Sequence, residues 1–118
     1  MNLVCFQGLD KENYPQLNAL IKRGEWEKIS IVKNKEADSF ISGDNISSVD
    51  INSALSILEL KEEIKEKLKP LLNSDFEVAL SLASGSGKEH MALISALLSI
   101  PVGIRLVVYT KNGVEYIN

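Results

Sequence analysis

The apolar residues of this 118-residue chain form short runs that alternate with segments of helical spacing. Short apolar runs bounded by polar residues or glycine are typical of buried strands, and apolar residues three and four positions apart are typical of helices. On this basis the sequence predicts strands over residues 2–6, 26–32, 48–51, 76–82, 104–110 and 114–117. Asn112-Gly113 predicts a tight turn between the last two of these strands.

Helices are predicted between the strands, over residues 17–21, 57–71 and 90–99, with a further short helix near residues 37–41 inside the polar loop 33–44. The first ends at Gly24, a common helix stop. The second has an apolar face opposite a charged run from Lys61 to Lys69, which is the pattern of a helix with one solvated side. The third is apolar nearly all round, so we expect neighbouring parts to cover it on more than one side.

The alternation of strands and helices predicts the fold class. It favours an α/β fold of Rossmann-like type, a three-layer sandwich in which helices cover both faces of a mostly parallel sheet. We expect about five strands and a terminal β-hairpin. The length of the chain suits a single domain over residues 1–118.

Composition narrows the class of protein. A formal net charge of -3 argues against a broad nucleic-acid-binding surface, which is usually basic. The only cysteine, Cys5, lies in an apolar run, so we expect a buried, inert thiol and no internal disulfide. No apolar run reaches the roughly 20 residues of a membrane span, and no secretory signal is evident, so we expect a cytoplasmic protein. No residue pattern predicts a metal site or a cofactor.

Two loops carry the candidate chemistry. Ligands of open parallel sheets bind beyond the carboxyl ends of the strands, where the strand order reverses. If the strands 2–6 and 76–82 are neighbours, the loop that contains Gly8 and Asp10 meets the turn Ser84-Gly85-Ser86-Gly87-Lys88 at that point. Further polar loop residues within reach of the same crevice are Lys11, Asn34 and Lys35.

The turn from Ser84 to Lys88 has the residue types of a phosphate-binding loop. Its small residues let backbone N–H groups approach a phosphate, the next helix offers its positive end, and Lys88 adds a charge. It is not a Walker A motif, because Leu82 and Glu89 stand where glycine and a hydroxyl residue are required. His90 occupies the third glycine position of a dinucleotide fingerprint. A purely structural turn with an exposed lysine is the alternative. His90 is open either to a ligand contact or general-acid role, or to a surface or capping role.

One stretch of the chain joins an apolar strand, a small-residue turn and a very apolar helix. The run 76–82 leads into Ser84-Gly85-Ser86-Gly87-Lys88, and Met91-Ala92-Leu93 continue the helix. This stretch resembles CRISPR-associated Rossmann-fold (CARF) domains, which are sensors of cyclic oligoadenylates with a turn of the type Thr/Ser-Gly-Gly-Thr/Asn-Lys/Arg. The local resemblance covers about residues 76–117. Ser86 and Gly87 depart from it, where a glycine and a hydroxyl residue are usual.

The resemblance implies a homodimeric sensor that holds a cyclic or linear oligoadenylate, or another nucleotide, across a two-fold axis. The surplus apolar surface of the helix near residues 91–98 also favours a homodimer. Two alternatives stay open: a metal-independent nuclease of cyclic nucleotides that uses Lys88 and Ser84, and an α/β domain that acts through protein contacts. No residue is assigned as catalytic, and the candidate ligand-binding residues are Gly8, Asp10, Ser84, Gly85, Ser86, Gly87 and Lys88.

Overall fold

A computed structural model describes residues 1–38 and 42–118, and in these residues six strands form one sheet. The strands are β1 (Asn2–Gln7), β2 (Ile29–Asn34), β3 (Ile46–Ile51), β4 (Glu77–Ser81), β5 (Gly103–Thr110) and β6 (Gly113–Tyr116). Their order across the sheet is β3-β2-β1-β4-β5-β6. The first five strands are parallel, and β6 runs antiparallel to β5. The predicted mostly parallel sheet with a terminal hairpin is therefore confirmed.

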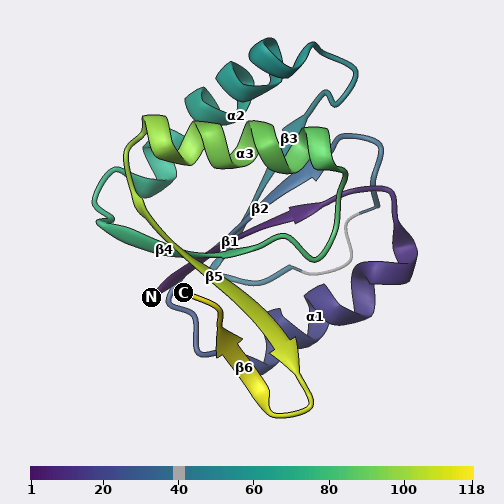
Figure 1. Ribbon diagram of the computed structural model, residues 1–118, viewed down its shortest axis with the longest axis vertical. Helices are drawn as coiled ribbons and strands as arrows, with labels where there is room; N and C mark the ends of the chain where they lie inside the picture. Colours follow the sequence, from purple (N-terminus) through teal and green to yellow (C-terminus); the bar gives the residue numbers. More distant parts are fainter. Residues whose placement is uncertain (39–41) are drawn as a thin grey trace.

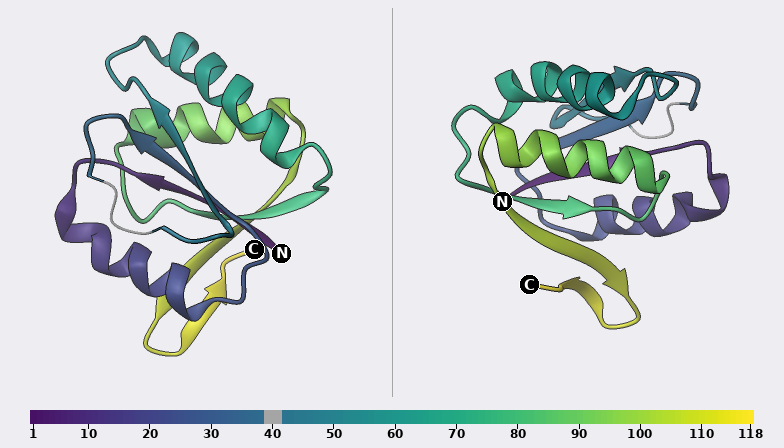
Figure 2. Two further views of the ribbon diagram at one scale, coloured as in Figure 1. Left: turned by 180° about the vertical axis from the view of Figure 1, so that it is seen from behind. Right: turned by 45° about the horizontal axis from the view of Figure 1, so that its top comes forward.

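The helices complete three layers. They are α1 (Tyr14–Arg23), which follows the short 3-10 helix η1 (Lys11–Asn13), α2 (Ile57–Leu72) and α3 (Gly87–Ser99). Figure 1 shows α2 and α3 together on one face of the sheet, and Figure 2 shows α1 on the opposite face. The Rossmann-like sandwich is confirmed. No helix in residues 1–38 or 42–118 has both the length and the apolar character needed to cross a membrane.

Each face of the sheet has its own hydrophobic core, because successive side chains of a strand point to opposite faces. Val4 and Phe6 of β1 pack toward α2 and α3, whereas Leu3 and Cys5 pack toward α1. Cys5 is fully buried, and this burial raises the pKa of its thiol to about 12. The thiol is therefore protonated and inaccessible at neutral pH, as predicted.

The helix α3 packs against the sheet and against α2, and one side of it is left uncovered. Its buried residues are Ala92, Leu93, Ala96 and Leu97, together with Glu89. Met91 and Leu98 lie on the uncovered side, each 63% exposed. A single copy of the chain therefore leaves large apolar side chains of α3 exposed.

Element boundaries differ from the prediction by one to three residues at most ends, and three of the differences have a clear structural consequence. Trp26 lies in the loop before β2 and not in the strand, because its indole N–H donates to the carbonyl of Leu20 at 2.9 Å and its ring packs over Gly24. The strand β3 begins at Ile46, two residues earlier than predicted. The helix α3 begins at Gly87, because Ser86 caps it. The short helix predicted near residues 37–41 falls partly on residues 39–41, which lie outside the described residues.

Candidate functional site

The order of the strands creates one crevice at the carboxyl edge of the sheet. The strands β1 and β4 are neighbours, with Cys5 opposite Ser81, and the chain leaves β1 toward α1 on one face and β4 toward α3 on the other. This is the point at which the strand order reverses, where ligands bind in open α/β sheets. The prediction that the loop after β1 meets the turn after β4 is confirmed.

Four residues fasten these two loops together, and we name them the Asp10–Ser84 clasp: Gly8, Asp10, Ser84 and Gly85. The hydroxyl of Ser84 donates to Asp10 Oδ1 at 2.7 Å and accepts the N–H of Gly8 at 2.9 Å. The N–H of Gly85 donates to the same carboxylate oxygen at 3.0 Å. Ser84 is fully buried, so its hydroxyl serves the contact between the two loops.

The clasp sets the ionisation of Asp10. Burial by itself would raise the pKa of this carboxyl. Hydrogen bonds from the side chains of Asn13 and Ser84 and from the N–H of Gly85 favour the charged form and outweigh that effect, so the pKa of Asp10 lies below its ordinary value. At neutral pH, therefore, a carboxylate already occupies the N–H group of Gly85, where the sequence predicted a phosphate.

The glycines of the site differ in whether the structure has space for a side chain at their positions. Gly8 and Gly85 touch, since a Cβ on Gly8 would lie 2.8 Å from the Cα of Gly85. Gly85 has a φ of +108°, and a Cβ there would lie 2.6 Å from Cδ1 of Phe6. Gly87, in contrast, has open space around the position of a Cβ. The first two glycines are required by the fold, whereas Gly87 faces the surroundings.

His90 contacts and stabilises the turn from Ser84 to Lys88. Its Nε2 lies 2.7 Å from the backbone carbonyl of Ser84, and because a carbonyl only accepts, Nε2 is the donor. Its ring also meets Phe6 edge to face, with the ring centroids 6.3 Å apart. These contacts favour the capping role among the two that the sequence left open.

The start of α3 is tied to the loop between β3 and α2. Ser86 and Glu89 form a capping box, in which Glu89 Oε1 accepts the N–H of Ser86 at 2.8 Å. The hydroxyl of Ser53 donates to the other oxygen of Glu89, and Lys88 Nζ donates to the carbonyl of Ser53 at 2.9 Å. Glu89 is only 6% exposed, so this carboxylate is an internal bridge. Sequence reasoning missed both Ser53 and Glu89, although the spacing Ser-x-x-Glu is the sequence pattern of a capping box.

Two of the seven predicted ligand residues present groups outward without serving the clasp or the cap. Gly87 and Lys88 are both exposed and form the first turn of α3. The first N–H groups of a helix have no acceptor within the helix. The hydroxyl of Ser86 accepts the N–H of Glu89 at 3.2 Å. The backbone N–H groups of Gly87 and Lys88 lie at the exposed end of the helix. Leu9, between Gly8 and Asp10 in the loop after β1, is 55% exposed.

The other polar loop residues have local partners. Lys11 lies 3.9 Å from the carboxylate of Asp38 in an exposed ion pair. The side chain of Asn34 accepts the N–H of Glu36 at 3.0 Å and so shapes the turn after β2. Lys35 is exposed. These contacts do not bring Lys11, Asn34 or Lys35 into hydrogen-bonding contact with the clasp.

Comparison with protein-family models and with curated proteins found no match to this chain. Within residues 1–38 and 42–118 there is no group of three or more His, Cys, Asp or Glu side chains that could hold a metal ion. The candidate site therefore rests on its own geometry: a clasped pair of loops at the switch point of the sheet, next to the exposed first turn of α3.

Proposed function

We propose that this domain binds a nucleotide or oligonucleotide at the crevice between β1 and β4 and acts as a homodimeric sensor. The CARF resemblance makes a cyclic oligoadenylate the first ligand to consider. The observation that carries the proposal is the exposed first turn of α3, where Gly87 and Lys88 offer two N–H groups and an ammonium at the switch point of the sheet.

The clasp reduces the number of residues that are able to contact a phosphate. Because Asp10 already accepts the N–H of Gly85, a phosphate there would face a carboxylate. We therefore assign phosphate contact to the N–H groups of Gly87 and Lys88 and to the ammonium of Lys88. That ammonium now donates to the carbonyl of Ser53, and a charged phosphate oxygen is the stronger acceptor.

The homodimer is supported by the uncovered side of α3. A hollow of about 420 Å³ runs along this helix, lined by Gly87, His90, Met91, Ile94, Ser95 and Leu98. Two copies that pair through this side would bury Met91 and Leu98 of both chains. The hollow begins at Gly87. If the two-fold axis passes beside the start of α3, the same pairing brings the two phosphate-contacting turns toward one another, as a ligand held on that axis requires.

The nuclease alternative depends on Ser84, and the geometry weakens it. Ser84 is fully buried, and its hydroxyl already donates to Asp10 and accepts from Gly8. A nucleophile must reach the phosphorus of its substrate. Ligand binding without rapid cleavage is therefore the function we favour.

A thermal-shift screen against linear and cyclic nucleotides, including oligoadenylates, tests the ligand. A ligand present at about 100 times its Kd stabilises the folded state by about 2.7 kcal/mol. Lys88→Ala should reduce the shift, whereas Lys111→Ala, which removes an exposed lysine of the β5–β6 hairpin, should leave it unchanged. The proposal fails if none of these nucleotides shifts the parent protein.

Light scattering at tens of micromolar tests the homodimer. We expect the parent to have twice the mass of one chain, and Leu98→Lys to have the mass of one chain. Leu58→Lys is the matched control, because Leu58 is 75% exposed on α2 and does not line the hollow along α3. A parent protein of single-chain mass, or equal effects of the two substitutions, would refute dimerisation through α3.

A further inference from the structure

The strand β3 is an edge of the sheet, and its backbone alternates between two directions. The N–H of Ile29 donates to the carbonyl of Asn45, and the N–H of Lys35 donates to that of Ile51. The odd-numbered residues of this segment thus direct their backbone groups toward β2. Ile46, Ser48 and Asp50 direct theirs outward, away from the sheet.

Two of the six outward groups have partners within the chain. The N–H of Ile46 donates to the carbonyl of Gly43 at 3.1 Å, and the carbonyl of Asp50 accepts from Lys67 Nζ at 2.7 Å. Among residues 1–38 and 42–118, no partner meets the carbonyl of Ile46, the N–H and carbonyl of Ser48, or the N–H of Asp50. Exposed strand edges in proteins are usually blocked by proline, bulges or covering segments. At Ser48 this edge is open.

The four open groups complement themselves. If a second copy of β3 lies antiparallel to the first with Ser48 opposite Ser48, the two serines exchange two hydrogen bonds. The N–H of each Asp50 then faces the open carbonyl of Ile46 in the other copy. The remaining pair in that register would be the N–H of Ile46 and the carbonyl of Asp50, and these are the two groups that already have internal partners. In a two-fold pairing about Ser48, each of the six outward backbone groups of β3 therefore has a hydrogen-bond partner.

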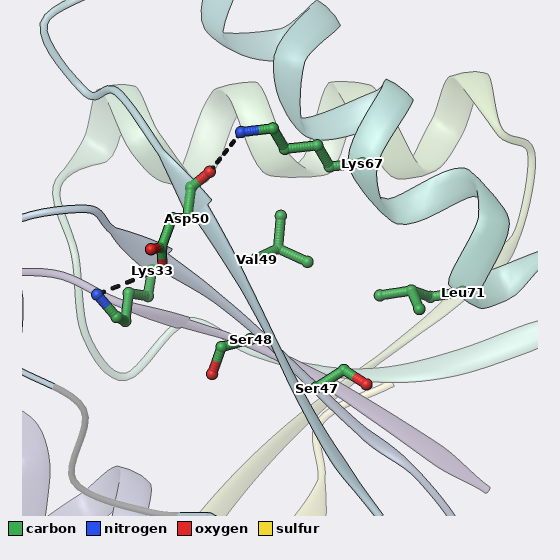
Figure 3. Close-up of a pocket in the computed structure, with 7 residues that line it drawn as sticks. All are labelled: Lys33, Ser47, Ser48, Val49, Asp50, Lys67 and Leu71. Atoms are coloured by element: carbon green, nitrogen blue, oxygen red, sulfur yellow. Dashed lines mark hydrogen bonds and ion pairs between the residues drawn. The ribbon is translucent and has the colours of Figure 1, made fainter.

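The side chains along the edge leave room for such a strand. A hollow of about 570 Å³ lies beside β3. Figure 3 shows Ser47 and Ser48 of β3 lining it, with Lys67 and Leu71 of α2 on its other side. The carboxylate of Asp50 is paired with the buried Lys33 at 3.3 Å. In the register about Ser48, each Asp50 faces Ile46 of the other copy, so no like charges stand opposite each other.

We propose that β3 is a second self-association surface, at which two copies of this chain join their sheets through antiparallel β3 strands centred on Ser48. This surface is separate from the uncovered side of α3 and does not depend on nucleotide binding. A chain that used both surfaces would assemble beyond a dimer, because each copy would then carry two different two-fold contacts.

Disulfide trapping tests the register. In a hydrogen-bonded antiparallel pair the Cα atoms are about 5.5 Å apart, which a disulfide can span. The full chain with Ser48→Cys should therefore form a covalent dimer within minutes of mild oxidation, seen by mass spectrometry and non-reducing electrophoresis. The native Cys5 is fully buried and does not interfere. Lys22→Cys, exposed on α1, is the control for random collision. If Ser48→Cys cross-links no faster than this control, the proposal is overturned.

A second measurement removes the contribution of α3. The β3 contact is the weaker of the two, so a chain that carries Leu98→Lys should be monomeric at tens of micromolar and self-associate in sedimentation velocity at concentrations approaching millimolar. Adding Ser48→Pro should raise its Kd at least tenfold, because proline lacks the outward N–H. The fold should persist, since that N–H has no role in pairing with β2, and circular dichroism checks this. A Leu98→Lys chain that stays monomeric at millimolar concentration, or one in which a folded Ser48→Pro has no effect, overturns the pairing and leaves the edge to a strand of another protein.

Discussion

The turn that opens α3 contains two glycines in opposite surroundings, and one substitution made at each of them tests the geometry of the site. Gly85 has a φ of +108°, and its Cβ would lie 2.6 Å from Phe6 Cδ1 and 3.0 Å from His90 Nε2. Gly87 is the first residue of α3, and a Cβ there meets nothing within 4 Å. We therefore compare Gly85→Ala with Gly87→Ala.

The expected magnitudes follow from these contacts. A side chain at positive φ costs about 1–2 kcal/mol, and forcing a methyl group into a filled space costs about 1–3 kcal/mol more. Gly85→Ala should thus lower the free energy of unfolding by about 2–5 kcal/mol. Gly87→Ala should raise it by about 0.4–1 kcal/mol, because alanine restricts the unfolded chain and fits the helix.

Urea unfolding followed by circular dichroism measures both changes. For a domain of this size, the loss at Gly85 corresponds to a fall in Tm of about 8–20 °C. The slope of the free energy of unfolding against urea concentration should be unchanged, since neither substitution alters the surface exposed on unfolding. If Gly85→Ala is as stable as the parent, or if Gly87→Ala is the more damaging of the two, the described geometry of the turn is wrong.

Two further predictions concern the clasp. Ser84→Ala should destabilise the fold by about 1–3 kcal/mol in urea unfolding, because the buried N–H of Gly8 loses its acceptor; a loss no larger than that of an exposed control such as Ser99→Ala would contradict the clasp. Asp10 has a lowered pKa in the folded state, so its contribution to stability is complete above the ordinary value of 3.8 and is lost as the pH falls through the lower folded pKa. Acid titration of the free energy of unfolding should show a smaller fall with pH in Asp10→Asn than in the parent, and parallel curves would refute this role.

The order of elements could be predicted from the sequence because each apolar run and each helical repeat indicates its own element. The run 76–82 stands between two helical patterns, and the Asn112-Gly113 turn identifies the last hairpin. The sequence alone does not predict that β1 and β4 are neighbours, since strand order depends on contacts between distant segments. The structure supplies it, and with it the meeting of the two loops.

The internal chemistry of the site was not predictable to the same extent. A single sequence shows that Asp10 and Ser84 are polar, but not that a hydrogen bond joins residues 74 positions apart. The same limit applies to Ser53 and Glu89, which are 36 positions apart. Trp26 was assigned to a strand from its residue type, whereas the carbonyl of Leu20 and the small Gly24 hold it in the preceding loop. The propensity of a residue does not register the partners of its side chain, whether these lie six or 74 positions away.

Calorimetric titration with a cyclic oligoadenylate and its linear counterpart, using Gly87→Glu and Gly87→Gln, tests the central claim most directly. Both side chains fit the open space at Gly87, and an acidic residue in the first turn is compatible with the helix dipole, so both variants should fold as the parent does. If phosphate contacts the first turn of α3, Gly87→Glu should weaken binding at least tenfold more than Gly87→Gln, because it adds a negative charge at the same place. A parent protein that binds neither ligand, or a Gly87→Glu variant that binds as tightly as the parent, would contradict nucleotide recognition at this turn.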